Sequence, residues 1–159
     1  MIITISKMGR KSLFFLVILF LLMNVGCSNK EEISPEEINN IRLVLKERKE
    51  DRDGTRFTLR LQNNSKYTIV QNNVYLSFPI KIENGSKSND YKIEAKQNKL
   101  HIKPGEEVML TVYTAKEMYE GNNKIDFENP NIEIKGYLDE MTETNLFYKG
   151  GGYSAMVDF

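Results

Sequence analysis

Apolar side chains recur at every second position on both sides of the pair Asp53-Gly54, and this pattern constrains the fold more than any other feature. The alternation runs through residues 41–46 and again through residues 57–62. A period of two is that of a β-strand with one buried face, and Asp-Gly between two such runs is a strong hairpin signal. The sequence therefore predicts an antiparallel hairpin whose first strand extends from about Asn40 to Arg48.

The turn of this hairpin, EDRDGT, also has the spaced aspartates with which calcium-binding loops begin. An EF-hand loop needs a carboxylate at its last position, and residues 55–60 contain none. We therefore expect a plain hairpin turn and no metal site at this position.

A helix start precedes the first strand. Ser34, Pro35 and Glu37 have the spacing of an N-cap, a first-turn proline and a capping-box glutamate. The following residues fit either period, since Ile38 and Ile41 would also share one face of a longer helix. The alternation beyond Asn40 favours a strand, so a helical turn limited to Pro35–Asn39 is expected.

The remainder of the chain consists of short runs rich in β-branched and aromatic residues, separated by turn residues. Asn72-Asn73 is expected to form a turn, Pro79 to mark an edge or a bulge, and residues 115–123 to form one helical turn. The expected strands are Tyr67–Val70, Val74–Ile82, Tyr91–Ala95, Leu100–Lys103, Val108–Tyr113 and a run from Ile132 to Leu138.

These runs together predict an all-β fold, an antiparallel sandwich of about seven or eight strands. The core is expected to contain the apolar residues that share a face at the strand period. They are Leu43, Leu45, Phe57, Leu59, Leu61, Val108, Leu110, Val112, Ile132 and Ile134.

The first 26 residues have the three regions of a signal peptide. Lys7, Arg10 and Lys11 form a basic start, Leu13–Met23 is an uninterrupted apolar run, and small residues follow. As a helix this run would span roughly 17 Å, which is short against a hydrocarbon core of about 30 Å. Translation from Met1 or from Met8 would give this layout. We expect residues 1–26 to be a signal peptide.

The four residues NVGC after the apolar run resemble the lipobox of bacterial lipoproteins, although Asn24 stands where that family usually has an aliphatic residue. The resemblance implies that Cys27 becomes the lipidated first residue of the mature chain. Residues 27–39 would then be a polar tether and residues 40–159 the folded domain, anchored in the cell membrane on its extracytoplasmic face. Plain secretory cleavage and an uncleaved anchor are the alternatives.

Two later segments, LRLQNNSKYTI and IKPGEEVMLTVY, resemble the immunoglobulin-like or fibronectin-III-like domains of exported bacterial proteins. In those domains an asparagine-rich turn follows one core strand and a Pro-Gly turn precedes another. The chain has no Trp and a single Cys, so it lacks the tryptophan and the disulfide of antibody domains. The resemblance, which covers about Ile41 to Phe159, therefore implies an architecture and no particular function.

Residues that carry chemistry are few. The single histidine, His101, is expected in a strand, opposite Leu100 and Ile102, as a surface residue. No nucleophile elbow occurs, and the 22 basic residues are scattered among 22 acidic ones. We therefore expect a protein that is not an enzyme, requires no cofactor or metal and does not bind nucleic acid.

Once enzymes and nucleic-acid-binding proteins are set aside, a non-catalytic role at the membrane surface is the expectation that remains. The expected function is a tethered interaction module for a protein or an envelope polymer, and the alternative is a small-ligand or ion carrier with its site in strand-end loops. Phe147, Tyr148 and Tyr153 bracket a triple glycine and form the candidate interaction surface. The competing interpretation is a hairpin loop whose aromatic residues pack on the core.

Overall fold

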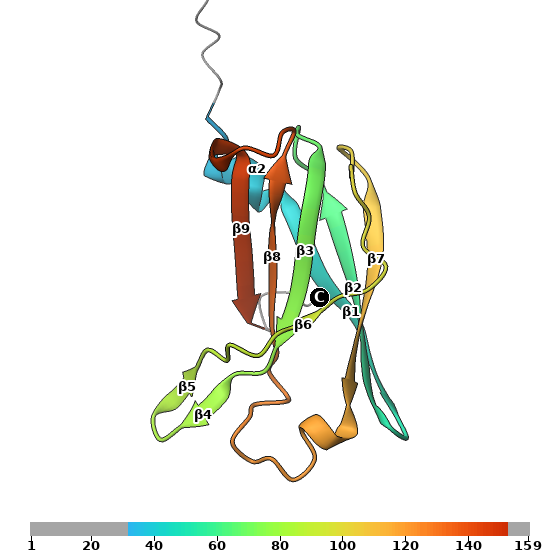
Figure 1. Ribbon diagram of the computed structural model, residues 1–159, viewed down its shortest axis with the longest axis vertical. Helices are drawn as coiled ribbons and strands as arrows, with labels where there is room; N and C mark the ends of the chain where they lie inside the picture. Colours follow the sequence, from blue (N-terminus) through green and yellow to red (C-terminus); the bar gives the residue numbers. More distant parts are fainter. Residues whose placement is uncertain (1–31, 153–159) are drawn as a thin grey trace, which may run out of the picture. The chain divides into compact units, whose positions relative to one another are not determined.

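The computed structural model describes residues 32–152, which form an antiparallel, immunoglobulin-like β-sandwich (Figure 1). One sheet has the order β1-β2-β7, with β1 at Ile41–Asp51, β2 at Gly54–Asn63 and β7 at Glu107–Ala115. The other has the order β6-β3-β8-β9, with β6 at Ile93–Glu94, β3 at Ile69–Ser77, β8 at Asn131–Leu138 and β9 at Leu146–Gly152. A separate hairpin pairs β4, Ile80–Ile82, with β5, Gly85–Lys87.

Three short helical segments complete the elements of the described residues: α2 at Pro35–Asn39, η1 at Lys116–Met118 and η2 at Glu143–Asn145. No helix within residues 32–152 is long and apolar enough to cross a membrane.

The core lies between the two sheets and confirms the ten residues that the strand period selected. Each of them is less than a tenth exposed, because on every strand one set of alternate side chains faces the opposite sheet. Nine further apolar residues of the described chain, which the predicted core did not include, belong to the same cluster. They are Ile41, Ile69, Val74, Leu76, Phe78, Ala95, Ile102, Leu138 and Phe147.

Helix α2 forms where the sequence predicted it and belongs to the folded unit. The Ser34 hydroxyl accepts a hydrogen bond from the Glu37 backbone N–H, as expected of an N-cap. Ile33 and Ile38 pack against the core, and the folded unit accordingly begins at Ile33 instead of residue 40.

The first hairpin is present, but its turn is not built on Asp53-Gly54. Asp51 pairs with Gly54, so Arg52 and Asp53 are the two turn residues and Gly54 is the first residue of β2. The glycine is required for a different reason, which is the close approach of β7. A Cβ on Gly54 would lie 2.3 Å from the backbone oxygen of Thr114.

Strand β3 contains the asparagine pair that was expected to form a turn. Asn72 is buried, and its backbone and side-chain oxygens both accept hydrogen bonds from the Asn98 amide, at 2.8 Å each. The Asn73 amide donates to Glu94, beside the strand. The prediction of a turn was wrong because these polar groups are satisfied by residues distant in sequence. The strand ends at Ser77, just before Pro79.

Residues 100–103 were expected to form a strand, and this prediction was also wrong. The segment makes one isolated bridge, from Ile102 to Ile69, and His101 has a φ of 53°, in the left-handed region. Ile102 is fully buried and His101 is exposed, which agrees with the surface role expected of the histidine.

The loop after β7 closes one end of the sandwich. The Arg48 guanidinium lies 4.6 Å from the centroid of the Phe127 ring and donates two hydrogen bonds to Glu128, at 2.7 and 3.0 Å. Tyr119 stacks on Phe127 at 3.7 Å between ring centroids and hydrogen-bonds to Thr55. These contacts hold the loop against the hairpin of β1 and β2.

Candidate functional site

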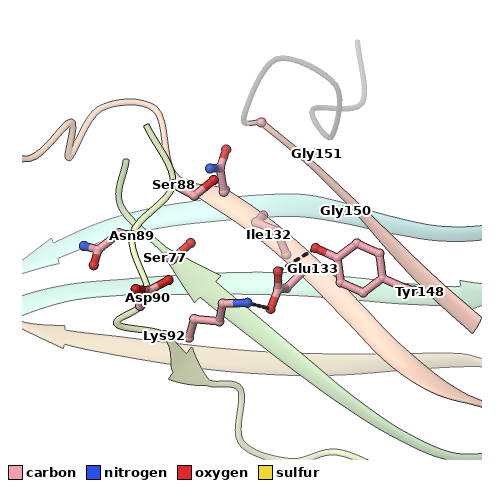
Figure 2. A pocket seen from close by; sticks show the side chains of 12 residues that line it. Ser77, Ser88, Asn89, Asp90, Lys92, Ile132, Glu133, Tyr148, Gly150 and Gly151 are labelled. Carbon is pink, nitrogen blue, oxygen red and sulfur yellow. Dashed lines mark hydrogen bonds and ion pairs between the residues drawn. The ribbon is translucent and has the colours of Figure 1, made fainter. Parts of the chain in front are cut away.

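A carboxylate on the outer face of the four-stranded sheet joins two side chains from different segments. Glu133 of β8 accepts a hydrogen bond from the Tyr148 hydroxyl of β9 at 2.7 Å and from the Lys92 ammonium at 2.5 Å. Lys92 directly precedes β6. Figure 2 shows the lysine and the tyrosine approaching Glu133 from opposite sides. We call these three residues the outer-face triad.

A glycine in β9 leaves room for the triad. Gly150 pairs with Glu133 across the two strands. A Cβ on Gly150 would lie 3.1 Å from the Tyr148 hydroxyl oxygen and 3.2 Å from the Cβ of Glu133. The absence of a side chain therefore lets the tyrosine lie along the strand and reach the carboxylate.

The hydrogen bonds of the triad change two protonation equilibria. The bond to Glu133 raises the pKa of Tyr148, and partial burial raises it further. The bond to the same carboxylate raises the pKa of Lys92, against a smaller lowering by desolvation. Both shifts extend to higher pH the range in which the tyrosine is a neutral donor and the lysine is a cation.

The triad borders a shallow hollow of about 290 Å³ at one end of the outer face (Figure 2). Backbone of the glycine run in β9 forms one wall, and the loop before β6 forms the other. The residues that line it are Ser77, Ser88, Asn89, Asp90, Lys92, Asn131, Ile132, Glu133, Tyr148, Gly150, Gly151 and Gly152.

A second open hollow continues along the same face, on the other side of Tyr148. Its volume is about 610 Å³, and Tyr75, Leu146 and Lys135 contribute to its lining. Tyr148 is 61% exposed and Leu146 is 41% exposed. The outer face thus presents an exposed aromatic ring between two depressions.

The structure separates the three aromatic residues that the sequence grouped as a surface. Phe147 is 2% exposed and belongs to the core, because it alternates with Tyr148 across β9. Tyr148 is at the surface, and Tyr153 lies outside the described residues. The glycine run, which the competing interpretation placed in a hairpin loop, instead pairs with β8 as part of β9.

Sequence reasoning missed Glu133 and Lys92. The position of Glu133 between Ile132 and Ile134 assigns its side chain to the outer face by alternation alone. Lys92 is separated from it by 41 residues, and no local signal joins the two. The pair forms because both flank β3 in the same sheet.

This face offers hydrogen-bonding groups of the triad and the exposed surface of Tyr148 and Leu146. Within residues 32–152 no three side chains of His, Cys, Asp or Glu are grouped so as to hold a metal ion. His101 lies in a different hollow, of about 420 Å³, with Leu100, Asp139 and Met141. The histidine and the outer-face triad therefore belong to separate surfaces.

Comparisons with known proteins give no independent assignment. No protein-family model matches the chain, and no curated protein matches it at a significant level. A functional proposal therefore depends on the geometry of the outer face and on the sequence signals of the first 27 residues.

Proposed function

We propose that this protein is a membrane-tethered, non-catalytic interaction module, and that its contact surface is the outer face around Tyr148. The observation that carries the proposal is an exposed tyrosine held in one orientation by a hydrogen bond to Glu133. Tyrosine buries a large area for the loss of few rotatable bonds. A ring that is already fixed before binding loses still less entropy on association.

The surroundings of Tyr148 also fit a macromolecular partner. Leu146 adds apolar area beside the ring, and the triad supplies polar groups around it. Interfaces typically combine a central aromatic anchor with a polar margin. The two open depressions on either side would receive protruding side chains of a partner.

A small-ligand carrier is the competing proposal, since the hollow beside the triad is formed partly by loop residues Ser88, Asn89 and Asp90. Its volume of about 290 Å³ is at the lower end of the range of small-molecule sites. Those sites enclose most of a ligand within apolar walls, whereas this hollow is shallow and lined by many polar groups. This contrast favours the interaction module.

The tethering part of the proposal depends on the lipobox resemblance at Cys27. A diacylglyceryl group anchors a protein stably, because two acyl chains bind a bilayer far better than one. The six residues from Cys27 to Glu32 span at most roughly 20 Å when extended. Such a tether would keep the domain close to the extracytoplasmic membrane surface and present it to envelope partners.

Site-specific photo-crosslinking tests the contact surface. A benzophenone amino acid replaces Tyr148 in the protein in its native envelope, and the same group replaces Tyr113 in a control. Tyr113 is 44% exposed on β7, in the other sheet. We expect a discrete crosslinked partner from position 148 and none from 113.

The matched substitutions Tyr148→Ser and Tyr113→Ser complete the test. Binding of the partner found by crosslinking should weaken about tenfold or more in the first variant and stay unchanged in the second. Equal crosslinking at the two positions, or equal binding by the two variants, would contradict the proposal. Binding of a small metabolite in the hollow, abolished by Asp90→Ala, would support the carrier instead.

A further inference from the structure

Strand β9 is the outer strand of its sheet within the described residues. It pairs with β8 on one side, and no other described strand pairs with its second side (Figure 1). Alternate backbone N–H and C=O groups of such an edge strand point away from the sheet. An extended polypeptide is the chemical group that matches this row of donors and acceptors.

Proteins usually protect an edge of this kind, and the sandwich does so at β1. Strand β1 has a bulge between Leu45 and Glu47, and its second half carries the exposed charged side chains of Lys46, Glu47, Lys49 and Glu50. Bulges and charges prevent pairing with another chain. Strand β9 has neither at its second half, where residues 150–152 are glycines without side chains.

The one charged side chain of β9 is directed into the protein. The Lys149 ammonium donates hydrogen bonds to the backbone oxygens of Asn39 at 3.0 Å and Ile41 at 2.8 Å. Burial lowers the pKa of this lysine. Its charge is thus used to join β9 to α2 and β1, and it does not protect the β9 edge as an exposed lysine would.

The glycines also leave space beside the edge. Gly152 lines the hollow next to the triad, and a Cβ there would meet only the side-chain oxygen of Asn131, at 3.6 Å. A bulky residue on a neighbouring strand commonly covers a glycine across a sheet. The hollow of about 290 Å³ has room for one such side chain.

We propose that the free edge of β9 binds an extended segment of a partner polypeptide as an added strand, with one bulky side chain of that segment in the hollow beside Gly152. This inference rests on the proposed function and specifies the kind of partner. A second copy of this chain fits less well. Two β9 strands paired antiparallel through their glycines would place glycine against glycine and leave the hollow empty.

Peptide selection on the full chain in detergent tests the inference. The probe is a library of random peptides of about ten residues, enough for one strand. We expect the selected peptides to alternate apolar and polar residues. With a bound peptide, hydrogen–deuterium exchange should then slow in the backbone of Leu146–Gly152. It should stay unchanged in Glu107–Ala115, one of the two edge strands of the other sheet.

Two substitutions at one position provide the matched control. Gly152→Lys places a charge on the edge and in the hollow and should weaken peptide binding about tenfold or more. Gly152→Ala keeps the edge free and should bind within about twofold of the original chain. Thermal unfolding of both variants checks that the fold is kept.

The outcomes separate this inference from the proposed function. Suppose that Tyr148 crosslinks a partner, but that no peptide is selected or that bound peptides leave exchange in Leu146–Gly152 unchanged. The added strand is then contradicted, whereas the proposed interaction module is not. Dimerisation through β9, seen by sedimentation and removed by Gly152→Lys, would also overturn the inference of an added partner strand. Failure of crosslinking at Tyr148 contradicts the proposed function itself.

Discussion

Gly54 at the start of β2 lies against Thr114 near the end of β7, so closely that a Cβ on the glycine would be 2.3 Å from the threonine backbone oxygen. The same added Cβ would lie 2.6 Å from the Tyr113 hydroxyl oxygen. The two strands are paired at this point, with Gly54 opposite Ala115. Only glycine permits this approach of the backbones.

Gly54→Ala should therefore destabilise the domain by about 1 to 3 kcal/mol, the usual cost of forcing extra volume into a packed site. Urea unfolding followed by fluorescence measures the change. Gly152→Ala is the control, because a Cβ there makes an ordinary contact, and it should change the free energy of unfolding little. Equal stability of the Gly54 variant and the original chain would mean that β7 can move away freely.

Leu59→Ala should destabilise the domain by about 2 to 5 kcal/mol. Leu59 is fully buried in the middle strand of its sheet, between Leu45 on β1 and Leu110 on β7. Truncation leaves a cavity that the two flanking strands cannot close. Thr58→Ala, at the neighbouring position on the outer face, should cost less, and a reversed order of the two effects would contradict the assignment of faces.

Thr114→Val should stabilise the domain by about 1 kcal/mol. Within the described residues the buried Thr114 hydroxyl has no hydrogen-bond partner. Valine has nearly the same shape and removes the polar group that is buried without compensation. Thermal and urea unfolding give the sign of the change, and a clear loss of stability would show that this hydroxyl has a partner in solution.

The outer-face triad should lose its stabilising effect at alkaline pH. The pKa values of Tyr148 and Lys92 are raised above 10.0 and 10.5 in the folded state by their bonds to Glu133. A group whose pKa is higher in the folded than in the unfolded state stabilises the fold. This contribution is complete when the pH is below the pKa of the unfolded state, and it is lost as the pH rises through the pKa of the folded state. The contribution is therefore present at neutral pH and declines above about pH 10.

The comparison of the original chain with Tyr148→Phe isolates this effect from the other titrating groups. Between about pH 9 and about pH 11 the free energy of unfolding should fall more steeply in the original chain than in the variant. Parallel curves for the two proteins would mean that the hydrogen bond between Tyr148 and Glu133 does not persist in solution.

Cys27→Ser should release the protein from the membrane fraction or leave it as an unprocessed precursor. The motive is the apolar run Leu13–Met23 followed by the lipobox-like NVGC, whose Cys27 lies outside the described part of the chain. Fractionation with mass spectrometry of the mature N-terminus checks the outcome. An unmodified first residue other than Cys27 in the original protein would contradict lipidation.

Part of the candidate site followed from the sequence. The aromatic residues beside the glycine run indicate a candidate surface in this segment, and the strand period of β9 places Tyr148 and Phe147 on opposite faces. The sequence did not decide which of the two is buried, because β9 has too few apolar residues to define a face. Packing of β9 beside β8 decided it, and the same pairing placed Glu133 next to Gly150.

Local patterns by themselves determined the elements that depend on neighbours in the chain. The cap at Ser34, the hairpin around residue 53 and the core face of β2 all follow from spacing within a few residues. Tertiary structure alone decided how distant segments meet. Asn72 lies within a strand because Asn98 supplies its hydrogen bonds, and Lys92 reaches Glu133 because both segments flank β3. The physical reason is that alternation is a local property, whereas partners for polar groups come from the packing of the sheets.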